Sequence, residues 1–435
     1  MAVTSSTRER EKVTGASESQ QRGFLLFWSG ETVSMFGTQV TLLALPLTAV
    51  LVLHATPGQL GLVRFAETFP YVLFTLIFGV WVDRRRRKPV LVLSNGARAL
   101  LIGLIPLLAV LGLLRLPLLA ALAFGAGVFS VLFDVAWPAY VPGLVRRDAL
   151  VAANGRLATS SAASEVAGPG LGGLLVQVLS APLALLADAV SYVVAVVTLL
   201  AIRTPETAPT PPARAGDAGR GRLLREIGEG LGAVWRNPLL RAIAVMSGLW
   251  NLLFGVADTT FLLYAIRELR VSAGTLGAIF AAGAVGGLLG SAVSTRLGRR
   301  GTFGPVLGIA FTFGCLPWLL LPAVRGSLPI EVAAFTLAYL LIRTGLGLWS
   351  VLVLSLRQAI TPSHLLGRVS GSLRLISYGL GTLGPLLGGL LGTVLGLRPT
   401  LWLAAAGFVV ILAITLTATP LPRVRTIPAE APADL

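Results

Sequence analysis

Twelve apolar runs of about 20 residues or more limit the fold of this chain more than any other feature. Each run is long enough to cross roughly 30 Å of hydrocarbon as an α-helix. Strands of a membrane β-barrel alternate apolar and polar residues, whereas these runs are apolar on all sides, which excludes a barrel. We expect an all-α integral membrane protein with transmembrane helices over approximately 24–53, 58–82, 89–113, 117–140, 152–179, 182–203, 239–266, 273–295, 303–323, 330–357, 365–395 and 398–419.

The composition supports a membrane protein and excludes several other classes. Only 12% of the residues are charged and 55% are apolar, whereas a soluble domain carries about 25% charged residues. The formal charge of +16 fits cytoplasmic loops facing anionic lipid, so we expect no nucleic-acid partner. Cys315 is the one cysteine and there are two histidines, so the sequence predicts no disulfide, metal site or cofactor. We expect a protein that is not an enzyme.

The loop charges predict the orientation of the chain. Of the 35 Lys and Arg residues, 25 fall in the two tails and the even-numbered connections, and five in the odd-numbered connections. Positive charge is retained on the cytoplasmic side of a membrane. The bias predicts twelve helices, with both termini in the cytoplasm, in the inner (plasma) membrane of a cell.

Two halves of the chain resemble each other at a fixed offset of 216 residues. Duplicated halves of a transporter place a substrate site between them near the middle of the membrane. We therefore predict an N-terminal six-helix bundle over 24–203 and a C-terminal bundle over 238–419. The remaining segments are predicted to be cytoplasmic: a tail over 1–23, a linker with a short amphipathic helix over 204–237, and a tail over 420–435.

A short turn between the second and third runs carries an acid followed by five consecutive cations. Its residues include Gly79, Asp83, Arg84, Arg87 and Lys88. A cationic turn alone is an ordinary topology anchor. Asp83 favours a second role, because an acid at a helix end can pair with a neighbouring helix and hold one conformation of the halves. The equivalent turn of the second half has no acid and contains Arg296, Gly298, Arg299 and Arg300.

Glycine and proline recur at equivalent places in the fifth and eleventh runs. Small residues allow another helix to approach closely, which is ordinary packing. Their repetition in both halves favours a mechanical role in gating instead. The residues are Gly155, Gly168, Pro169, Gly172 and Gly173, repeated as Gly371, Gly384, Pro385, Gly388 and Gly389.

These motifs resemble the major facilitator superfamily. The cationic turn resembles its loop motif, with Arg86 in place of the inner glycine. The fifth run is similar to the antiporter motif of drug exporters, with Ser164 where glycine is usual, and the fourth run lacks the arginine of many proton-coupled exporters. The segments AETFP, NGARA, AYVPGLV, DAVSY and GRVSG resemble the macrolide-efflux and siderophore-export branch, also called transmembrane secretion effectors. The resemblance covers roughly 24–420 and implies two bundles that expose a central site alternately.

Six acids lie inside the apolar runs, where a charge costs about 2.5–3.5 kcal/mol near the bilayer centre. A carboxyl group shielded from water can take up a proton and release it when a cation binds. We predict that Glu67, near mid-depth, couples protons to transport, with Glu31 as the next candidate and Asp134 as the third. Arg64 could instead pair with Glu67 in a purely structural role. The full set is Glu31, Glu67, Asp134, Glu165, Asp188 and Asp258.

Aromatic residues are predicted to supply part of the substrate site. The resemblance implies that helices 1, 2, 7 and 10 line the cavity, and aromatic faces suit bulky amphipathic or cationic ligands. Most aromatics should contact lipid or other helices, so we expect a minority to touch substrate. The candidates are Trp28, Phe65, Phe69, Tyr71, Trp250, Phe254, Arg343 and Trp349.

The sequence therefore predicts a secondary active efflux transporter for hydrophobic or amphipathic, drug-like small molecules, working by proton antiport and alternating access. Its expected partners are the small-molecule substrate, protons and membrane lipid, and we expect a monomer. The chain carries no P-loop sequence for ATP. One alternative is a dedicated exporter of one metabolite or siderophore. Another is a transport-inactive membrane sensor or assembly partner, against which the glycines of both halves argue.

Overall fold

The computed structural model describes residues 3–204, 206, 220–297 and 303–424. Over these ranges the chain is helical and contains no strand, and twelve of its helical segments are long and apolar enough to cross a membrane. The predicted all-α fold with twelve spans is confirmed. The second cationic turn (Gly298, Arg299 and Arg300), residues 207–219 and residues 425–435 lie outside the described residues.

The chain divides into two compact units. Unit 1 contains Met1–Thr48 and Ala66–Pro211, and unit 2 contains Ala49–Phe65 and Pro212–Leu435. The segment Ala49–Phe65 therefore groups with unit 2, although the sequence analysis placed it in the N-terminal bundle. Helices α1 and α2 each contribute to both units, while the division of the spans into two sets of six stays a prediction.

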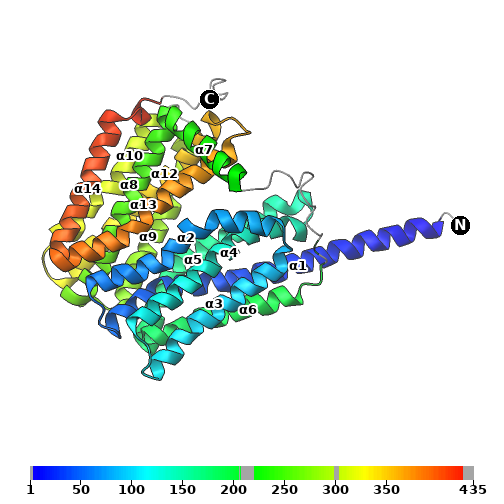
Figure 1. Cartoon of the computed structure of the whole chain (residues 1–435), viewed down its shortest axis with the longest axis horizontal. Coiled ribbons are helices and arrows are strands. Elements are labelled where there is room, and N and C mark those ends of the chain that lie inside the picture. Colours follow the sequence, from blue (N-terminus) through cyan, green and yellow to red (C-terminus); the bar gives the residue numbers. More distant parts are fainter. Residues whose placement is uncertain (1–2, 205, 207–219, 298–302, 425–435) are drawn as a thin grey trace. The chain divides into compact units, whose positions relative to one another are not determined.

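Unit 1 is built from six long helices. A short 3-10 helix, η1 (Arg147–Ala149), precedes α5, and α3 packs along both α4 and α6 (Figure 1). Small residues bring α1 close to α6: a Cβ added to Gly30 would lie 3.3 Å from the Cα of Ala195. The six helices are α1 (Val3–Leu51), α2 (Pro57–Asp83), α3 (Arg87–Val110), α4 (Leu116–Leu144), α5 (Leu150–Leu179) and α6 (Ala181–Ala201).

Helix α1 begins at Val3, within the segment expected to be an unpatterned tail. The sequence from Arg8 to Lys12 is rich in Arg, Glu and Lys, which have good intrinsic helix propensity. This helix carries no amphipathic pattern, so apolar periodicity alone could not predict it.

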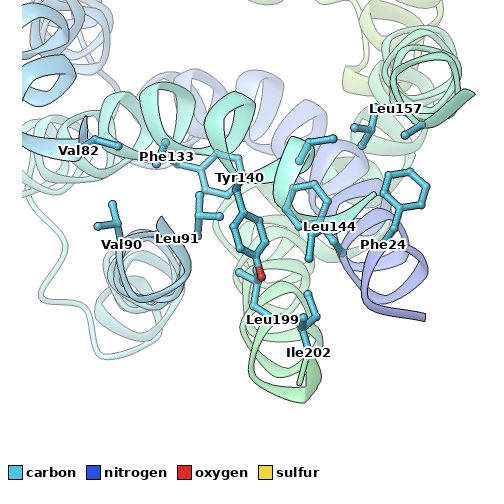
Figure 2. Packing of buried hydrophobic residues seen from close by; sticks show 14 of the residues in the cluster. Phe24, Val82, Val90, Leu91, Phe133, Tyr140, Leu144, Leu157, Leu199 and Ile202 are labelled. Carbon is cyan, nitrogen blue, oxygen red and sulfur yellow. The ribbon is translucent and has the colours of Figure 1, made fainter. Parts of the chain in front are cut away.

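A hydrophobic cluster closes the end of unit 1 that lies beside the cationic turn. It draws side chains from all six helices, and Val82 and Val90 flank the turn itself. Figure 2 shows the ring of Tyr140 among these side chains, with its hydroxyl directed towards Leu199 and Ile202. Phe27 meets the Tyr140 ring edge-on, with centroids 5.7 Å apart. This packing holds the ends of α2 and α3 in fixed positions on either side of the turn.

Unit 2 contains the remaining helices. Helix α8 continues into a π-helical turn, η2 (Tyr264–Glu268). The ninth span is divided into α10, η4 (Leu316–Leu319) and α11, because Pro317 has no N–H to continue the helix. Helix α12 packs along α9, and α13 packs along α8 (Figure 1). The helices are α7 (Arg220–Arg236), α8 (Pro238–Leu263), α9 (Ala273–Leu297), α10 (Phe303–Cys315), α11 (Leu320–Ala323), α12 (Leu328–Ile360), α13 (Leu366–Val394) and α14 (Leu397–Ala418), followed by η5 (Leu421–Arg423).

Candidate functional site

A buried arginine lies at the centre of the polar interior of unit 1. Arg98 projects from α3, its side chain is 5% exposed, and its guanidinium donates a hydrogen bond to the Oδ1 atom of Asn95. The guanidinium carbon lies 4.3 Å from the ring centroid of Phe133 and 4.4 Å from that of Tyr192. Two aromatic rings therefore hold the cation by cation–π contact in a water-poor environment.

Three carboxylates on other helices share the field of this cation. Arg98 acts electrostatically on Glu31 of α1, Asp134 of α4 and Asp188 of α6. Glu31 and Asp188 are buried, whereas Asp134 is exposed in the structure. One guanidinium can balance one carboxylate, so the cluster holds up to two negative charges that Arg98 does not balance.

Two of these acids have further hydrogen-bond partners. The hydroxyl of Thr41 donates to the Oδ2 atom of Asp188 at 2.5 Å, and Ser191 donates to its Oδ1 atom at 3.1 Å. Asp134 accepts one hydrogen bond, from the hydroxyl of Tyr71 at 2.8 Å. Asp188 is thus tied into the helix packing, while the carboxylate of Asp134 stays exposed.

Glu67, the first-choice coupling residue, lies on α2 and is half-buried. Its backbone carbonyl packs against α4, where a Cβ added to Gly127 would lie 2.5 Å from the oxygen. The structure thus gathers Glu31 and Asp134, the second and third candidates, around Arg98. A coupling role for Glu67 stays a prediction.

The aromatic candidates of unit 1 occupy different surroundings. The indole N–H of Trp28 donates to the hydroxyl of Ser160 at 3.0 Å, and the guanidinium of Arg156 lies 5.9 Å from the Trp28 ring centroid. Tyr71 reaches Asp134 and so belongs to the Arg98 cluster. Phe69 is half-buried on α2.

The cationic turn is anchored by an acid that the sequence analysis did not single out. Glu206 accepts the backbone N–H groups of Arg87 and Lys88 at 2.5 Å and 3.1 Å, so its carboxylate caps the N-terminus of α3. The ammonium of Lys88 also donates to the carbonyl of Ile202 at 2.6 Å. Asp83 and Arg84 are exposed, and a conformational role for Asp83 stays a prediction.

The glycines of the turn motif and of the repeated motif fall into two groups. A Cβ added to Gly79, Gly155 or Gly371 would meet nothing within 4 Å. By contrast, five glycines nearer the prolines lie where α5 meets α1 and where α13 meets α8 and the 49–65 segment. Those in close contact are Gly168, Gly172, Gly384, Gly388 and Gly389. Gly173 is buried.

Unit 2 contains an ion pair within its apolar interior. The Nη1 atom of Arg64 lies 3.1 Å from the Oδ2 atom of Asp258 on α8, and the Tyr339 hydroxyl donates to the other carboxylate oxygen at 3.4 Å. Arg343, a predicted cavity residue, lies on α12 four residues after Tyr339 and is half-buried. This ion pair helps to explain why the 49–65 segment, which also contains Phe65, groups with unit 2.

An aromatic cavity of about 100 Å³ opens between α8, α10 and α12 of unit 2. Trp250 and Trp349, two predicted substrate residues, line it, whereas Phe254 stacks behind Trp250 with centroids 5.2 Å apart. The rings of Phe311 and Trp349 lie 4.7 Å apart. The complete lining is Ser247, Trp250, Asn251, Ala310, Phe311, Gly314, Gly345, Leu346 and Trp349.

Most of the chain matches a known protein family. A model described as the Major Facilitator Superfamily matches residues 27–383. This chain belongs to the Major Facilitator Superfamily. The predicted resemblance is confirmed, and the chain is a multi-pass transporter and not an enzyme.

Two curated relatives of this superfamily member are named as exporters. The chain is 27% identical over 383 residues to the multidrug efflux pump Tap of Mycolicibacterium fortuitum, covering 84% of this chain and 88% of the relative. It is 28% identical over 345 residues to the enterobactin exporter EntS of Escherichia coli O1:K1 / APEC, covering 75% of each.

Solved structures show the same fold. The nucleoside transporter NupG matches with a TM-score of 0.72 at 12% identity, over 92% of this chain and 98% of that one. A bacterial homologue of the iron transporter ferroportin in the inward-facing state matches with a TM-score of 0.66 at 20% identity, over 91% and 98%. At these identities the likeness establishes the superfamily fold alone.

Sequence reasoning did not assign roles to Arg98, Asp258, Glu206 or Phe311. Arg98 and Asp258 carried a usable signal, because a charge inside an apolar run needs a partner. Glu206 lies in a polar linker, and Phe311 lies among many apolar residues, so neither stands out before the helices are placed.

Proposed function

We propose that this superfamily member exports hydrophobic or amphipathic small molecules in exchange for protons, with the Arg98 cluster as the coupling site. The observation that carries this proposal is the buried guanidinium of Arg98, held between rings of α4 and α6, the helices that carry Asp134 and Asp188. Its charge acts on both of these acids and on Glu31 of α1. The names of its relatives, a multidrug efflux pump and a siderophore exporter, support the outward direction.

The charge of the cluster explains how a proton and a substrate can compete. Uncompensated charge is costly in a low-dielectric interior, so the negative charge that Arg98 does not balance requires a proton or a cationic group. A cationic substrate that approaches the exposed Asp134 would release a proton, and reloading the proton would release the substrate. Glu31 and Asp134 are the proposed carriers because Asp188 is already held by Thr41 and Ser191.

Transport by the purified protein in proteoliposomes tests this proposal. With a panel of ethidium and macrolides as probes, the wild-type protein should accumulate a probe when a pH gradient is imposed. Glu31→Gln and Asp134→Asn should lose gradient-driven accumulation but retain exchange of probe across a membrane without a gradient. Glu67→Gln in the same assay decides the remaining candidate.

Glu165→Gln provides the matched control for these acids. Glu165 is an exposed acid on α5, where Ser161 donates to it at 3.3 Å, and its neutralisation should leave accumulation unchanged. Full gradient-driven transport by both Glu31→Gln and Asp134→Asn would overturn the coupling site. Absence of flux for every probe in the wild-type protein would favour the sensor or assembly role instead.

A second candidate function is dedicated export of one metabolite or siderophore, which the similarity to the enterobactin exporter EntS favours. Adding siderophores to the probe panel separates the two. Transport of several unrelated dyes and macrolides supports broad efflux, and transport of one siderophore alone supports the dedicated exporter. Cytoplasmic termini, a plasma-membrane location and a monomer remain predictions.

A further inference from the structure

The 216-residue repeat extends from the sequence to the packing inside each unit. A Cβ added to Gly168 would contact Gln39, and one added to Gly384 would contact Gly255. Gly384 lies 216 residues after Gly168, and Gly255 lies 216 residues after Gln39. The contact of Gly172 with Val40 recurs as that of Gly388 with Val256. The offset therefore relates equivalent positions inside the two units.

The same offset places the counterparts of Glu31 and Arg98 in the lining of the aromatic cavity of unit 2, whereas those of Asp134 and Asp188, Ser350 and Ala404, are not lining residues. Glu31 corresponds to Ser247 and Arg98 to Gly314, so the two charged side chains are replaced by a hydroxymethyl group and a hydrogen. Four lining residues of the cavity are counterparts of residues around Arg98 at the offset of 216: Ser247 for Glu31, Phe311 for Asn95, Gly314 for Arg98 and Trp349 for Phe133.

The cavity occupies the region that the charged side chains fill in unit 1. Trp250, which corresponds to Ser34, takes part of that space, and its indole N–H donates to the carbonyl of Gly314 at 3.2 Å. The space left over is about 100 Å³. This is less than the apolar cavity of about 150 Å³ that holds a benzene molecule, so the space admits at most one ring.

The lining determines which group fits. None of its nine residues is charged, so a cation there would lose its hydration without a carboxylate to replace it. Phe311 and Trp349, whose ring planes are inclined at 44°, offer aromatic surface for stacked or edge-to-face contact. Ser247 and Asn251 add a hydroxyl and an amide for a polar substituent on a ring.

We propose that this cavity binds a neutral aromatic ring of the transported molecule, in the place where unit 1 holds its own arginine and glutamate. Only the claim that the ring belongs to a transported molecule rests on the proposed function. The binding itself does not depend on proton coupling or on flux.

Photolabelling of the full chain in lipid nanodiscs tests this site. The probe is 3-trifluoromethyl-3-phenyldiazirine, a small neutral aromatic, and labelled peptides are identified by mass spectrometry. Labelling of the segments around Phe311 and Trp349 should saturate and be competed by toluene. The same diazirine bearing a trimethylammonium group on its ring should not label these segments saturably.

Two variants on α12 form a matched pair. Leu346→Phe fills the cavity and should reduce saturable labelling about tenfold, because overpacking leaves no room for the ring. Leu337→Phe, at a position 50% exposed on the same helix, should leave labelling unchanged. Trp349→Ala, which removes an aromatic wall, should also reduce labelling and guards against misfolding of the first variant.

A third variant tests the relation between the units. Ser247→Glu places the acid of unit 1 in the cavity of unit 2 and should give the cationic probe saturable labelling there. Absence of saturable labelling in the monodisperse wild-type protein, or equal labelling by both probes, would overturn the proposal. If the wild-type protein shows no saturable labelling but transports a probe along the pH gradient, this site alone is refuted. If it is labelled saturably but transports no probe, only the proposed transport is refuted.

Discussion

The interiors of the two units differ most at positions that the internal repeat makes equivalent. Unit 1 holds a buried guanidinium between two rings with three carboxylates in its field, and unit 2 holds a cavity with an uncharged aromatic lining. The glycine contacts that join the helices are shared by both units. A duplicated scaffold has thus kept these helix contacts while the equivalent positions diverged, towards charge in unit 1 and towards an uncharged aromatic lining in unit 2.

Removing the cation of unit 1 should have the largest effect. Arg98→Met leaves the buried acids Glu31 and Asp188 without the cation whose field they share. A buried polar group left without a partner costs about 1–3 kcal/mol of unfolding free energy, and more when it is charged. We expect a large drop in the thermal unfolding midpoint in detergent at neutral pH and a smaller drop at acidic pH, where protonation removes the uncompensated charge. Arg374→Met, at an exposed position on α13, is the control. An unchanged midpoint for Arg98→Met would remove the distinction between the units.

The shared glycine contacts should give the next largest effect, and an unequal one. The Cβ of Gly384→Ala would lie 2.4 Å from the Leu252 carbonyl oxygen and 2.7 Å from the Gly255 Cα, both backbone atoms. Relief requires the helices to separate, for a cost of about 1–3 kcal/mol. In unit 1 the Cβ of Gly172→Ala would lie 3.2 Å from its nearest neighbour, the Cα of Val40, so this substitution should destabilise the protein less.

Gly371→Ala, whose Cβ would meet nothing within 4 Å, serves as the control for these two variants. We expect it to retain the wild-type unfolding midpoint or to exceed it slightly, since alanine favours a helix. Equal destabilisation by all three substitutions would show that the close contacts do not determine the cost.

The ion pair of unit 2 should give the smallest effect. A double-mutant cycle with Arg64→Gln and Asp258→Asn should yield a coupling energy of about 0.5–3 kcal/mol, because the pair is largely shielded from water. Arg368 and Glu229 form a matched pair at 2.6 Å with side chains 36% and 41% exposed. Their coupling should fall within about 0–1 kcal/mol. A stronger coupling for the exposed pair would contradict the assignment of Asp258 to a shielded interior.

The sequence predicts the fold well because the solvent dictates it. Each span must satisfy its own backbone within hydrocarbon, so run length alone identifies the helices. It predicts the glycines at helix contacts only in part: Gly168 and Gly384 lie in close contacts, whereas Gly155 and Gly371 of the same motifs do not. Spacing along one helix cannot show which neighbour it meets.

The candidate site is harder to predict because its residues come from separate helices. Glu31 and Asp134 are recognisable as intramembrane acids, but their grouping around Arg98 depends on how α1, α3 and α4 pack. The cavity beside Gly314 exists because small residues, among them Gly314 and Ser247, leave space between aromatic ones. Small residues in an apolar run do not by themselves indicate a cavity in the sequence. It becomes visible only when the repeat is applied to the structure.

Proton release on substrate binding is the sharpest test of coupling at the Arg98 cluster. The purified transporter in weakly buffered detergent is mixed with a saturating amount of a transported cationic probe, and the pH change is recorded. We expect proton release by the wild-type protein, its loss in the Glu31→Gln, Asp134→Asn double variant, and its retention in Leu346→Phe at saturating probe. Undiminished release by the double variant would contradict the assignment of proton coupling to the Arg98 cluster.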